Sequence, residues 1–532
     1  MPTIGKSLRL MAGYAALGIL RGAARAVESG MKASAAAEPH YDYTGNSKRS
    51  QSWAPSNPSI GALLFGSGAR LRSQSRDLIR RNGWARNGKR SFVGNAIGLG
   101  IKPRSVAKDE KFREAAMALW LRWTDEADAD GTLDYYGLQA LVAGAVFEAG
   151  ECFVRFRTRR IEDGLSVPFQ LQVLESEMLP LEKNEVLPSG NEIRAGIEFN
   201  QIGKRVAYHF WKRHPGDNHF FPFGAFETVR VPASEVLHVY EVTRPGQIRG
   251  EPKTAAALAT LRELEQYEDA ELLRKKLQNF FMAFVTRINK DANVLNEPVT
   301  PDGKIDHTGG QSSVAMVPGV VQYLDQNEDM KFSEPPHATP GEIDFLKQKL
   351  HLVAAAMGTT YENLTGDLAG VTFSSIRAGL IEFRRVLEQF QHFVIAFQFC
   401  RPVWIRWMDL AVLSDALEAK GYEENPYDFQ QVEWIAPKWS YVNPIDDVKA
   451  DVIATRAGFK SRARVQSEAG EDPEQLDREI DRCNKRADQL ELVFDSDARR
   501  TSAAGVGQIV GGGQSQRDPE TGEETPRERS AA

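Results

Sequence analysis

The stretch SSIRAGLIEFRRVLEQFQHFVIAFQ, residues 374–398, carries the most regular hydrophobic pattern in the chain. This pattern keeps one face of an α-helix apolar and predicts a long helix over 374–420, with a packing seam along it. Pro402 lies inside this helix and lacks the N–H that would bond residue 398, so a kink is predicted near 398–402. The seam residues follow one another at alternating spacings of four and three: Ile376, Leu380, Phe383, Leu387, Phe390, Val394 and Phe397.

Two more helices are predicted on either side of an insertion. Residues 254–282 contain no Gly or Pro and are dominated by good helix formers, which indicates a helix of roughly 40 Å. A second helix over 339–357 starts with Thr339 as N-cap and Glu342 three positions later, the pattern of a capping box. Between them lies a β-like insertion. Its expected strands are Ala283–Ile288, Ser313–Leu324 and Met330–Phe332. This order is unusual for a compact enzyme and favours an elongated subunit of a larger assembly.

Residues 135–245 are predicted to form antiparallel strands. Short β-branched and aromatic runs recur there between Gly and Pro residues, which is typical of strands joined by turns. The runs are CFVRFR, FQLQVLE, RVAYHFWK, TVRVP and VLHVYEV.

The two ends of the chain differ from the rest. The apolar run at 10–20 is followed by Arg21 and Arg25, and its eleven residues are too few to cross a bilayer, which needs about 20. A short amphipathic helix is therefore favoured over a secretion signal for the arm 1–40. Residues 496–532 are rich in Gly, Gln, Glu, Arg and Ser, so we expect a disordered tail.

Composition indicates a globular, multi-domain protein. The chain has 532 residues, 42% of them hydrophobic and 26% charged. Its three cysteines, Cys152, Cys400 and Cys483, lie far apart, which fits a reducing compartment such as the cytosol and argues against a disulfide framework. Cys152 lies in a strand pattern and is expected to be a core thiol.

The net charge of −6 argues against tight binding to nucleic acid, because duplex affinity comes mostly from Lys and Arg at phosphates. The charge is unevenly distributed. Residues 66–104 hold ten basic side chains and one acid, Asp77, a net of +9. This basic segment could contact phosphate, but a solvated face or a contact between subunits or domains is the favoured interpretation.

The sequence contains weak matches to two known binding motifs. Residues 83–90 have the Gly and Lys spacing of a P-loop, but Arg90 replaces the Ser or Thr that binds magnesium. Residues 125–131 resemble the start of a calcium loop through Asp128, Asp130 and Gly131, yet the twelfth position is Gly137 where a Glu is needed. We therefore expect no catalytic residue, metal or cofactor.

Three histidines at intervals of five could in principle bind zinc: His209, His214 and His219. A fixed interval of five suits neither one face of a strand nor one face of a helix. We therefore expect them to be exposed histidines of a hairpin.

A resemblance adds to these patterns. The run YENLTGDLAGVTFSSIRAGLIEFRR (361–385) resembles the signature of the lambda-type bacteriophage portal proteins. Residues 41–53, 71–103 and 434–480 agree in the family's order, so the similarity extends from about 40 to 490. The departures are slight: Phe373 stands where Tyr is common, and Asn443 where Asp is usual.

The resemblance implies an α+β portal fold with a β-rich wing, a two-helix stem, a β-containing clip, a long kinked wing helix and a helical crown. The implied parts are the arm at 1–40, the first part of the wing at 41–250, stem helices at 251–282 and 339–358, the clip at 283–338, the tunnel-loop region at 359–373, the kinked helix and second part of the wing at 374–444, the crown at 445–495 and the tail at 496–532.

The resemblance also implies a function. Such a protein forms a ring, typically of twelve copies, at one capsid vertex of the virion, and is assembled in the host bacterial cytoplasm. Double-stranded DNA passes through it, and the implied partners are the terminase large subunit, head-completion, connector and tail proteins, and the major capsid or scaffold protein. The implied DNA-channel residues are those of the tunnel loop: Gly366, Asp367, Leu368, Ala369, Gly370, Val371 and Thr372.

Two other classes remain open at this point. A scaffold or capsid subunit would share the helices but not the order of stem, clip and tunnel loop. A nucleic-acid-translocating motor would need a true P-loop around Lys89.

Overall fold

The computed structural model describes residues 57–217, 227–278, 283–287, 328–332, 342–439, 443–494, 497 and 499. The chain divides into two compact units, Met1–Ala62 and Leu63–Ala532. The first contributes only residues 57–62 to the described part, where helix α2 (Ile60–Arg81) begins. The predicted N-terminal arm, Thr339, His219 and nearly all of the C-terminal tail lie outside the described residues.

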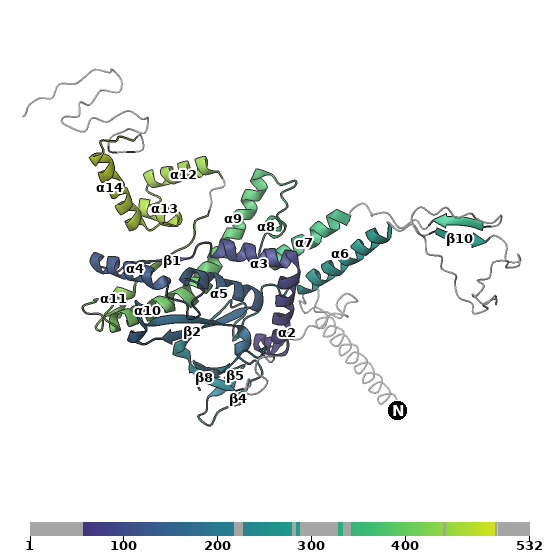
Figure 1. The fold of residues 1–532 in the computed structure, drawn as a ribbon, viewed down its shortest axis with the longest axis horizontal. Coiled ribbons are helices and arrows are strands. Elements are labelled where there is room, and N and C mark those ends of the chain that lie inside the picture. Colours follow the sequence, from purple (N-terminus) through teal and green to yellow (C-terminus); the bar gives the residue numbers. More distant parts are fainter. Residues whose placement is uncertain are drawn as a thin grey trace, which may run out of the picture. The chain divides into compact units, whose positions relative to one another are not determined.

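The larger unit mixes helices with small antiparallel sheets (Figure 1), which confirms the α+β class. Its central core is aromatic and joins helices α4 (Glu110–Thr124), α5 (Tyr135–Ala149) and α10 (Arg401–Leu413). Four tryptophans and a tyrosine pack ring against ring there: Trp120, Trp123, Trp404, Trp407 and Tyr135. Among the described helices, none has the length and hydropathy of a membrane span.

Two sheets form the β-rich part. The first has the order β3 (Phe169–Leu174), β2 (Glu151–Thr158), β9 (Val236–Tyr240). The second has the order β4 (Glu185–Val186), β5 (Glu192–Arg194), β6 (Ile197–Phe199), β7 (Arg205–Trp211), β8 (Thr228–Pro232). The five predicted strand runs are confirmed as β2, β3, β7, β8 and β9. The start of the predicted β region is wrong, because Tyr135–Ala149 is helix α5, capped by Asp134 and ended by Gly150.

Short elements complete this region. Strand β1 (Lys102–Ser105) pairs with β12 (Val432–Ile435), far along the chain. Three single 3-10 turns, η1 (Ile161–Asp163), η2 (Ser176–Met178) and η3 (Ala233–Glu235), connect strands.

The two predicted flanking helices are confirmed as α6 (Leu258–Gln278) and α7 (Glu342–Ala356), which pack together through Tyr267 and Phe345. Of the insertion between them, strands β10 (Ala283–Arg287) and β11 (Glu328–Phe332) are described and pair antiparallel. These two strands agree with the prediction, whereas the candidate at 313–324 lies outside the described residues.

The long helix is interrupted differently from the prediction. Helix α9 (Phe373–Phe390) continues directly into η4 (Gln391–Cys400), a π-helix, and then into α10, which ends at Leu413 and not near 420. The N–H of Arg401 bonds Ala396, five residues back. The hydrogen bonds of a π-helix join residues five apart, so successive side chains are rotated about the helix axis by a different angle than in an α-helix. The apolar seam therefore leaves the core, and Phe397 is 58% exposed. The seam prediction is correct for Phe383 to Val394 and wrong for Phe397.

The C-terminal part of the described chain is helical, as expected. It contains α11 (Pro426–Gln430), α12 (Pro444–Arg456), α13 (Arg462–Glu468) and α14 (Pro473–Gln489). Helix α14 is held to α4 by Arg113 to Glu474 at 3.2 Å and by Arg478 to Glu114 at 2.6 Å.

A buried carboxylate joins the two sheets. Glu151 begins β2 and has no exposed surface. One of its oxygens accepts from Ser176 Oγ at 2.6 Å and from Arg249 Nε at 2.8 Å. The other accepts from His238 Nε2 at 2.9 Å and from the Gly250 N–H at 2.7 Å. Arg249 is also buried and donates to carbonyls that flank the second sheet, among them Ala195 at 2.9 Å. The charge is therefore paired and fully hydrogen-bonded.

Two glycines allow this arrangement. Gly150, at φ +85°, and Gly250 cross backbone against backbone. A Cβ on Gly250 would lie 2.1 Å from the carbonyl oxygen of Gly150, and a Cβ on Gly150 would lie 2.4 Å from the carbonyl carbon of Glu251. Neither position can hold a larger residue without moving the backbone.

We expect Gly250→Ala to lower the free energy of unfolding by at least about 3 kcal/mol, because the clash is with backbone and would pull the Gly250 N–H from Glu151. Gly66→Ala is the matched control, since nothing lies within 4 Å of its added Cβ and the residue is helical. Chemical denaturation measures both variants. Equal stabilities would contradict the close crossing.

The Glu151 cluster also predicts a pH dependence. Burial lowers the pKa of His238 to about 4, in spite of the attraction of Glu151. The neutral ring donates from Nε2, and its buried Nδ1 has no hydrogen-bond partner within the described chain, so a second proton there would be unsatisfied. The unfolded chain binds this proton near its usual pKa of 6.5. Stability should therefore fall by about 3 kcal/mol as the pH drops from 6.5 to 4.

Unfolding free energies of the wild type and of His238→Gln, measured across this pH range, test the assignment. The variant should lose the contribution of His238, about 3 kcal/mol over this range, whereas His392→Gln, at an exposed histidine, should keep it. An unchanged slope in His238→Gln would show that another group is responsible.

Candidate functional site

The loop at 366–372 is fixed at both ends by helix caps. Helix α8 (Tyr361–Thr365) ends at Gly366 with φ +73°. Thr372 caps α9 and forms a capping box with Ser375. Gly370, at φ +76°, makes the remaining turn, and no atom lies within 4 Å of where its Cβ would stand. Both glycines have left-handed backbone, which residues with a side chain rarely adopt.

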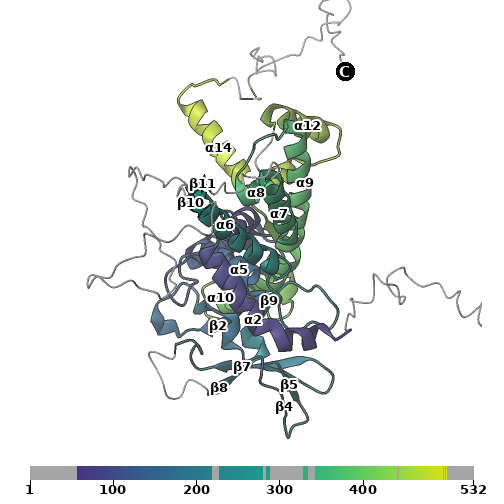
Figure 2. The same ribbon diagram turned by 90° about the vertical axis from the view of Figure 1, so that its right-hand side faces the viewer.

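Asp367 holds the loop to its supporting helices. Its carboxylate accepts from the Ala369 N–H at 2.9 Å and from the Tyr361 hydroxyl at 3.0 Å, and lies 3.7 Å from Lys347 Nζ of α7. The Ala369 N–H, followed by the Tyr361 hydroxyl, holds the pKa of Asp367 below its usual range. Tyr361 in turn stacks on His351 of α7, with ring centroids 4.2 Å apart. Figure 2 shows α7, α8 and α9 side by side.

Leu368 is 61% exposed, and Ala369, Gly370 and Thr372 are also exposed. The loop contains no Lys or Arg. It therefore presents small neutral groups and one already paired carboxylate to its surroundings.

The P-loop-like residues have a structural role. Residues 83–90 form the first turns of helix α3 (Gly83–Ala96), with Asn82 as its N-cap, so they cannot wrap a phosphate. Lys89 pairs with Glu148 of α5. Asn87 donates to the carbonyls of Asn363 and Leu364 at 3.0 and 2.8 Å, and so binds the last turn of α8.

The two hydrogen bonds from Asn87 link helix α3, which belongs to the basic segment, to helix α8 just before the loop. No sequence pattern indicates them. Gly88 permits the contact, since a Cβ there would lie 2.6 Å from Met357 Cε at the end of α7. Helix α3 therefore supports α7 and α8 together.

The basic segment is largely neutralised within the chain. Of its ten basic side chains, six form ion pairs: Arg72, Arg76, Arg80, Arg81, Lys89 and Arg104. Within the described residues, the remaining four have no ion-pair partner: Arg70, Arg86, Arg90 and Lys102. A continuous phosphate-binding stripe is therefore not supported. Six of the ten basic side chains are exposed, as expected of a solvated face, whereas Arg72 is buried and pairs with other elements.

The calcium-like residues form a closed turn. Asp128 accepts from the N–H groups of Asp130, Thr132 and Leu133 at 2.8 to 3.1 Å. Burial raises the pKa of Asp128, but these donors outweigh it and hold the pKa below its usual value. Its oxygens are occupied by the protein's own backbone.

The histidines do not converge. His209 is buried on β7 and lies 3.1 Å from Glu198, so the expectation that it is exposed is wrong. Arg230 also pairs with Glu198, at 2.7 Å, and with the other hydrogen bonds lowers the pKa of Glu198 to about 2. His214 lies instead 3.0 Å from Glu175.

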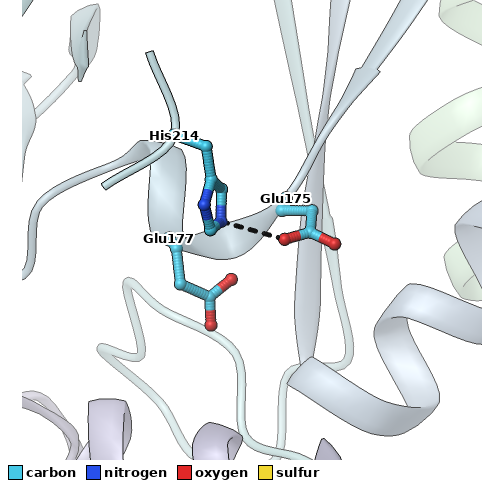
Figure 3. Close-up of side chains that lie close together, drawn as sticks. All are labelled: Glu175, Glu177 and His214. Carbon is cyan, nitrogen blue, oxygen red and sulfur yellow. Dashed lines mark ion pairs between the residues drawn. The ribbon is translucent and has the colours of Figure 1, made fainter. Parts of the chain in front are cut away.

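Glu175, Glu177 and His214 come close enough to hold a metal ion (Figure 3). However, Arg76 pairs with Glu175 at 3.4 Å and with Glu177 at 2.8 Å, and Arg72 also pairs with Glu177. Two guanidinium groups already neutralise the carboxylates, so the cluster is an ion-pair network and a cation would have to displace them. Cys152 is buried, as expected, and burial raises the pKa of its thiol far above its usual value.

The described residues thus combine a capped loop, packed helices and a strand pair, and the catalytic patterns of the sequence are used for packing. The family model for "Phage portal protein, lambda family" matches residues 46–391, well over half of the chain. The chain belongs to the lambda family of phage portal proteins, and its role is that of a phage portal protein.

Individual relatives agree. A probable portal protein of Halomonas phage phiHAP-1 is 27% identical over 434 residues, covering 79% of this chain and 81% of the relative. Portal protein B of Escherichia phage lambda is 20% identical over 488 residues, covering 85% and 87%. The portal protein of Escherichia phage N15 is 19% identical over 468 residues, covering 80% and 85%.

Solved structures were also matched. The neck of a native gene transfer agent particle, computed with C12 symmetry, aligns with a TM-score of 0.42 at 14% identity, covering 78% of this chain and 95% of the other. The virion of a native gene transfer agent particle gives 0.41 at 15% identity, covering 76% and 94%.

The support of the loop by α3 can be tested. Asn87→Ala removes two hydrogen bonds to the α8 carbonyls, so hydrogen exchange should become faster across residues 361–372 and the unfolding free energy should fall by about 1 to 2 kcal/mol. Asn95→Ala is the matched control, because Asn95 bonds within α3 to Ser91. If both variants exchange alike at 361–372, α3 does not hold the loop.

Proposed function

We propose that the chain forms a ring at one capsid vertex, through which double-stranded DNA passes during genome packaging and ejection. The terminase and later the head-completion or tail proteins attach to the same ring. Helices α6 and α7 form its stem, the strands β10 and β11 belong to the clip, and the 366–372 loop is the tunnel loop. The sheets contribute to the wing, and α12 to α14 form the crown.

The observation that carries this proposal is the 366–372 loop itself. A conduit has to contact DNA without retaining it, and each Lys or Arg at a phosphate would add affinity through counterion release. The loop offers none, and its one carboxylate is bonded to Tyr361 and Ala369. The loop lies between the α7–α8 pair and α9. Three helices can therefore hold the loop while its apolar tip stays exposed.

The net charge supports the same mechanism. A ring of twelve copies would carry −72, which favours repulsion from DNA in most of the channel and contact at a few places only. We expect neither ATP hydrolysis nor a cofactor, since the residues of the apparent P-loop lie in helix α3.

Deletion of 367–371 tests the role of the loop. Rings should still assemble, because the caps at Gly366 and Thr372 remain, but particles should retain packaged DNA poorly. The measurement is the DNA content of purified particles after nuclease treatment. A second variant, with five Gly and Ser residues in place of 367–371, separates the effect of loop length from that of its side chains. Leu413→Ala, at an exposed site on α10, is the control. Normal retention in the deletion variant would refute the assignment.

A further inference from the structure

Three arginines form a row on one face of β2, the middle strand of the first sheet (Figure 1). Arg155, Arg157 and Arg159 stand at alternate positions, so their side chains leave the same side of the sheet, about 6.7 Å apart along the strand. Arg159 continues the strand pairing, since its N–H bonds the Pro168 carbonyl at 2.9 Å. The opposite face of β2 packs into the central core. Each of the three arginines is partly exposed, and we call them the arginine row.

Glutamines of β3 orient two of the three guanidinium groups without neutralising them. Arg157 donates from Nε and Nη2 to Gln172 Oε1 at 2.9 and 2.6 Å. Arg159 donates from Nε to Gln170 Oε1 at 2.8 Å. An amide oxygen accepts these bonds but carries no net charge. The two side chains are therefore held in place while their positive charge remains available to a ligand.

Arg155 has no side-chain hydrogen bond or ion pair within the described part of the chain, and its Nε is buried. Arg157 and Arg159 each bond the residue that lies diagonally across from them on β3. By the same geometry the residue for Arg155 is Leu174, which offers no acceptor. On the β9 side Arg155 lies opposite Val236. A buried donor without an acceptor costs free energy, so this position calls for an acceptor that the described residues do not supply.

The charge of the row is not compensated. Burial lowers the pKa of Arg157, and the charges of Arg155 and Arg159 lower it further. Glu235 and Asp130 are near enough to raise this pKa, but within the described chain neither forms an ion pair with the row. Three like charges in line repel one another, and guanidinium groups are donors only. A ligand that relieves both costs is an anion with several acceptor oxygens.

We propose that the arginine row binds the phosphate backbone of double-stranded DNA. A planar guanidinium group matches phosphate oxygens with two parallel hydrogen bonds. A nucleic-acid strand repeats one charge per nucleotide, so an evenly spaced row can contact its phosphates in many registers. A protein partner would instead need three carboxylates placed to match.

The inference rests on the proposed function, which brings double-stranded DNA to the ring, and it adds a contact outside the 366–372 loop. Salt screens partly exposed charges, and three phosphate contacts per copy give only modest affinity. The row therefore fits a protein that touches DNA without retaining it.

Substitutions in the full-length chain test the row. Binding of a short fluorescent DNA duplex is measured by anisotropy over a series of salt concentrations, with Arg155→Gln and with the double variant Arg155→Gln, Arg159→Gln. Each substitution should weaken binding about fivefold at low salt. Each should also reduce the slope of log affinity against log salt by about 0.9. Arg155→Lys keeps the charge and should keep the slope.

Stability and a matched control separate the row from a general effect of charge. Because Arg155 has no partner in the described chain, Arg155→Gln should not lower the free energy of unfolding. Arg86→Gln removes the same charge at an exposed residue of α3 and should bind the duplex like the wild type. An equal loss of affinity in Arg86→Gln, or an unchanged affinity and slope in Arg155→Gln, would overturn the inference. If the double variant does not fold, Arg155→Gln alone carries the test.

Ring formation, seen by negative-stain microscopy, distinguishes this inference from the proposed function. The wild type and all variants should form rings. Wild-type rings together with unchanged duplex binding in Arg155→Gln would refute the row and leave the proposed function standing. A wild type without rings would contradict the proposed function, while the difference between Arg155→Gln and Arg86→Gln would still decide the row. Loss of rings in Arg155→Gln, or tighter binding of polyglutamate than of the duplex, would assign the row to a carboxylate-bearing protein surface and overturn the inference.

Discussion

The carboxylate of Glu151 is the constraint on which the β-rich part depends. A charge with no exposed surface is costly unless every lone pair is satisfied, and here the donors come from separate segments: Ser176, His238, Arg249 and Gly250. The chain can bring them together only where Gly150 and Gly250 cross without side chains. The first sheet, the turn at η2 and the approach to α6 are therefore positioned by one hydrogen-bonded group.

The same region explains the basic segment. Arg72 lies 3.8 Å from Glu151 and pairs with Glu177, while Arg76 and Lys89 pair with Glu148 of α5. The acids that neutralise these side chains belong to helices and turns that a linear charge count places elsewhere. Four of the ten basic side chains in the segment of net +9 thus connect it electrostatically to other parts of the fold: Arg72, Arg76, Lys89 and Arg104. A charge run in a sequence indicates affinity for phosphate only where the fold leaves the charges unpaired.

Local patterns predicted helices α6, α7, α9 and α10 and five strands of the two sheets, because spacing and β-branched runs report which face is buried. They failed where a contact across the fold decides. Seven of the ten residues 391–400 are apolar, so the sequence does not show that the repeat changes to five, as from Ile395 to Cys400, both buried. His209 is buried because Glu198 and Arg230 lie on neighbouring strands. For the 366–372 loop, the turns could be predicted from its glycines. Its contact with Lys347 and the bonds from Asn87 to α8 could not.

The π-helix changes which side of the long helix is buried. Before η4, the long helix buries Phe383, Leu387 and Phe390, and after it α10 buries Trp404 and Trp407. Between the two sets, within η4, Phe397 turns outward and is 58% exposed. Since α9 begins at the cap of the 366–372 loop, the continuous helical stretch of α9, η4 and α10 joins that loop to the aromatic core around Trp404 and Trp407.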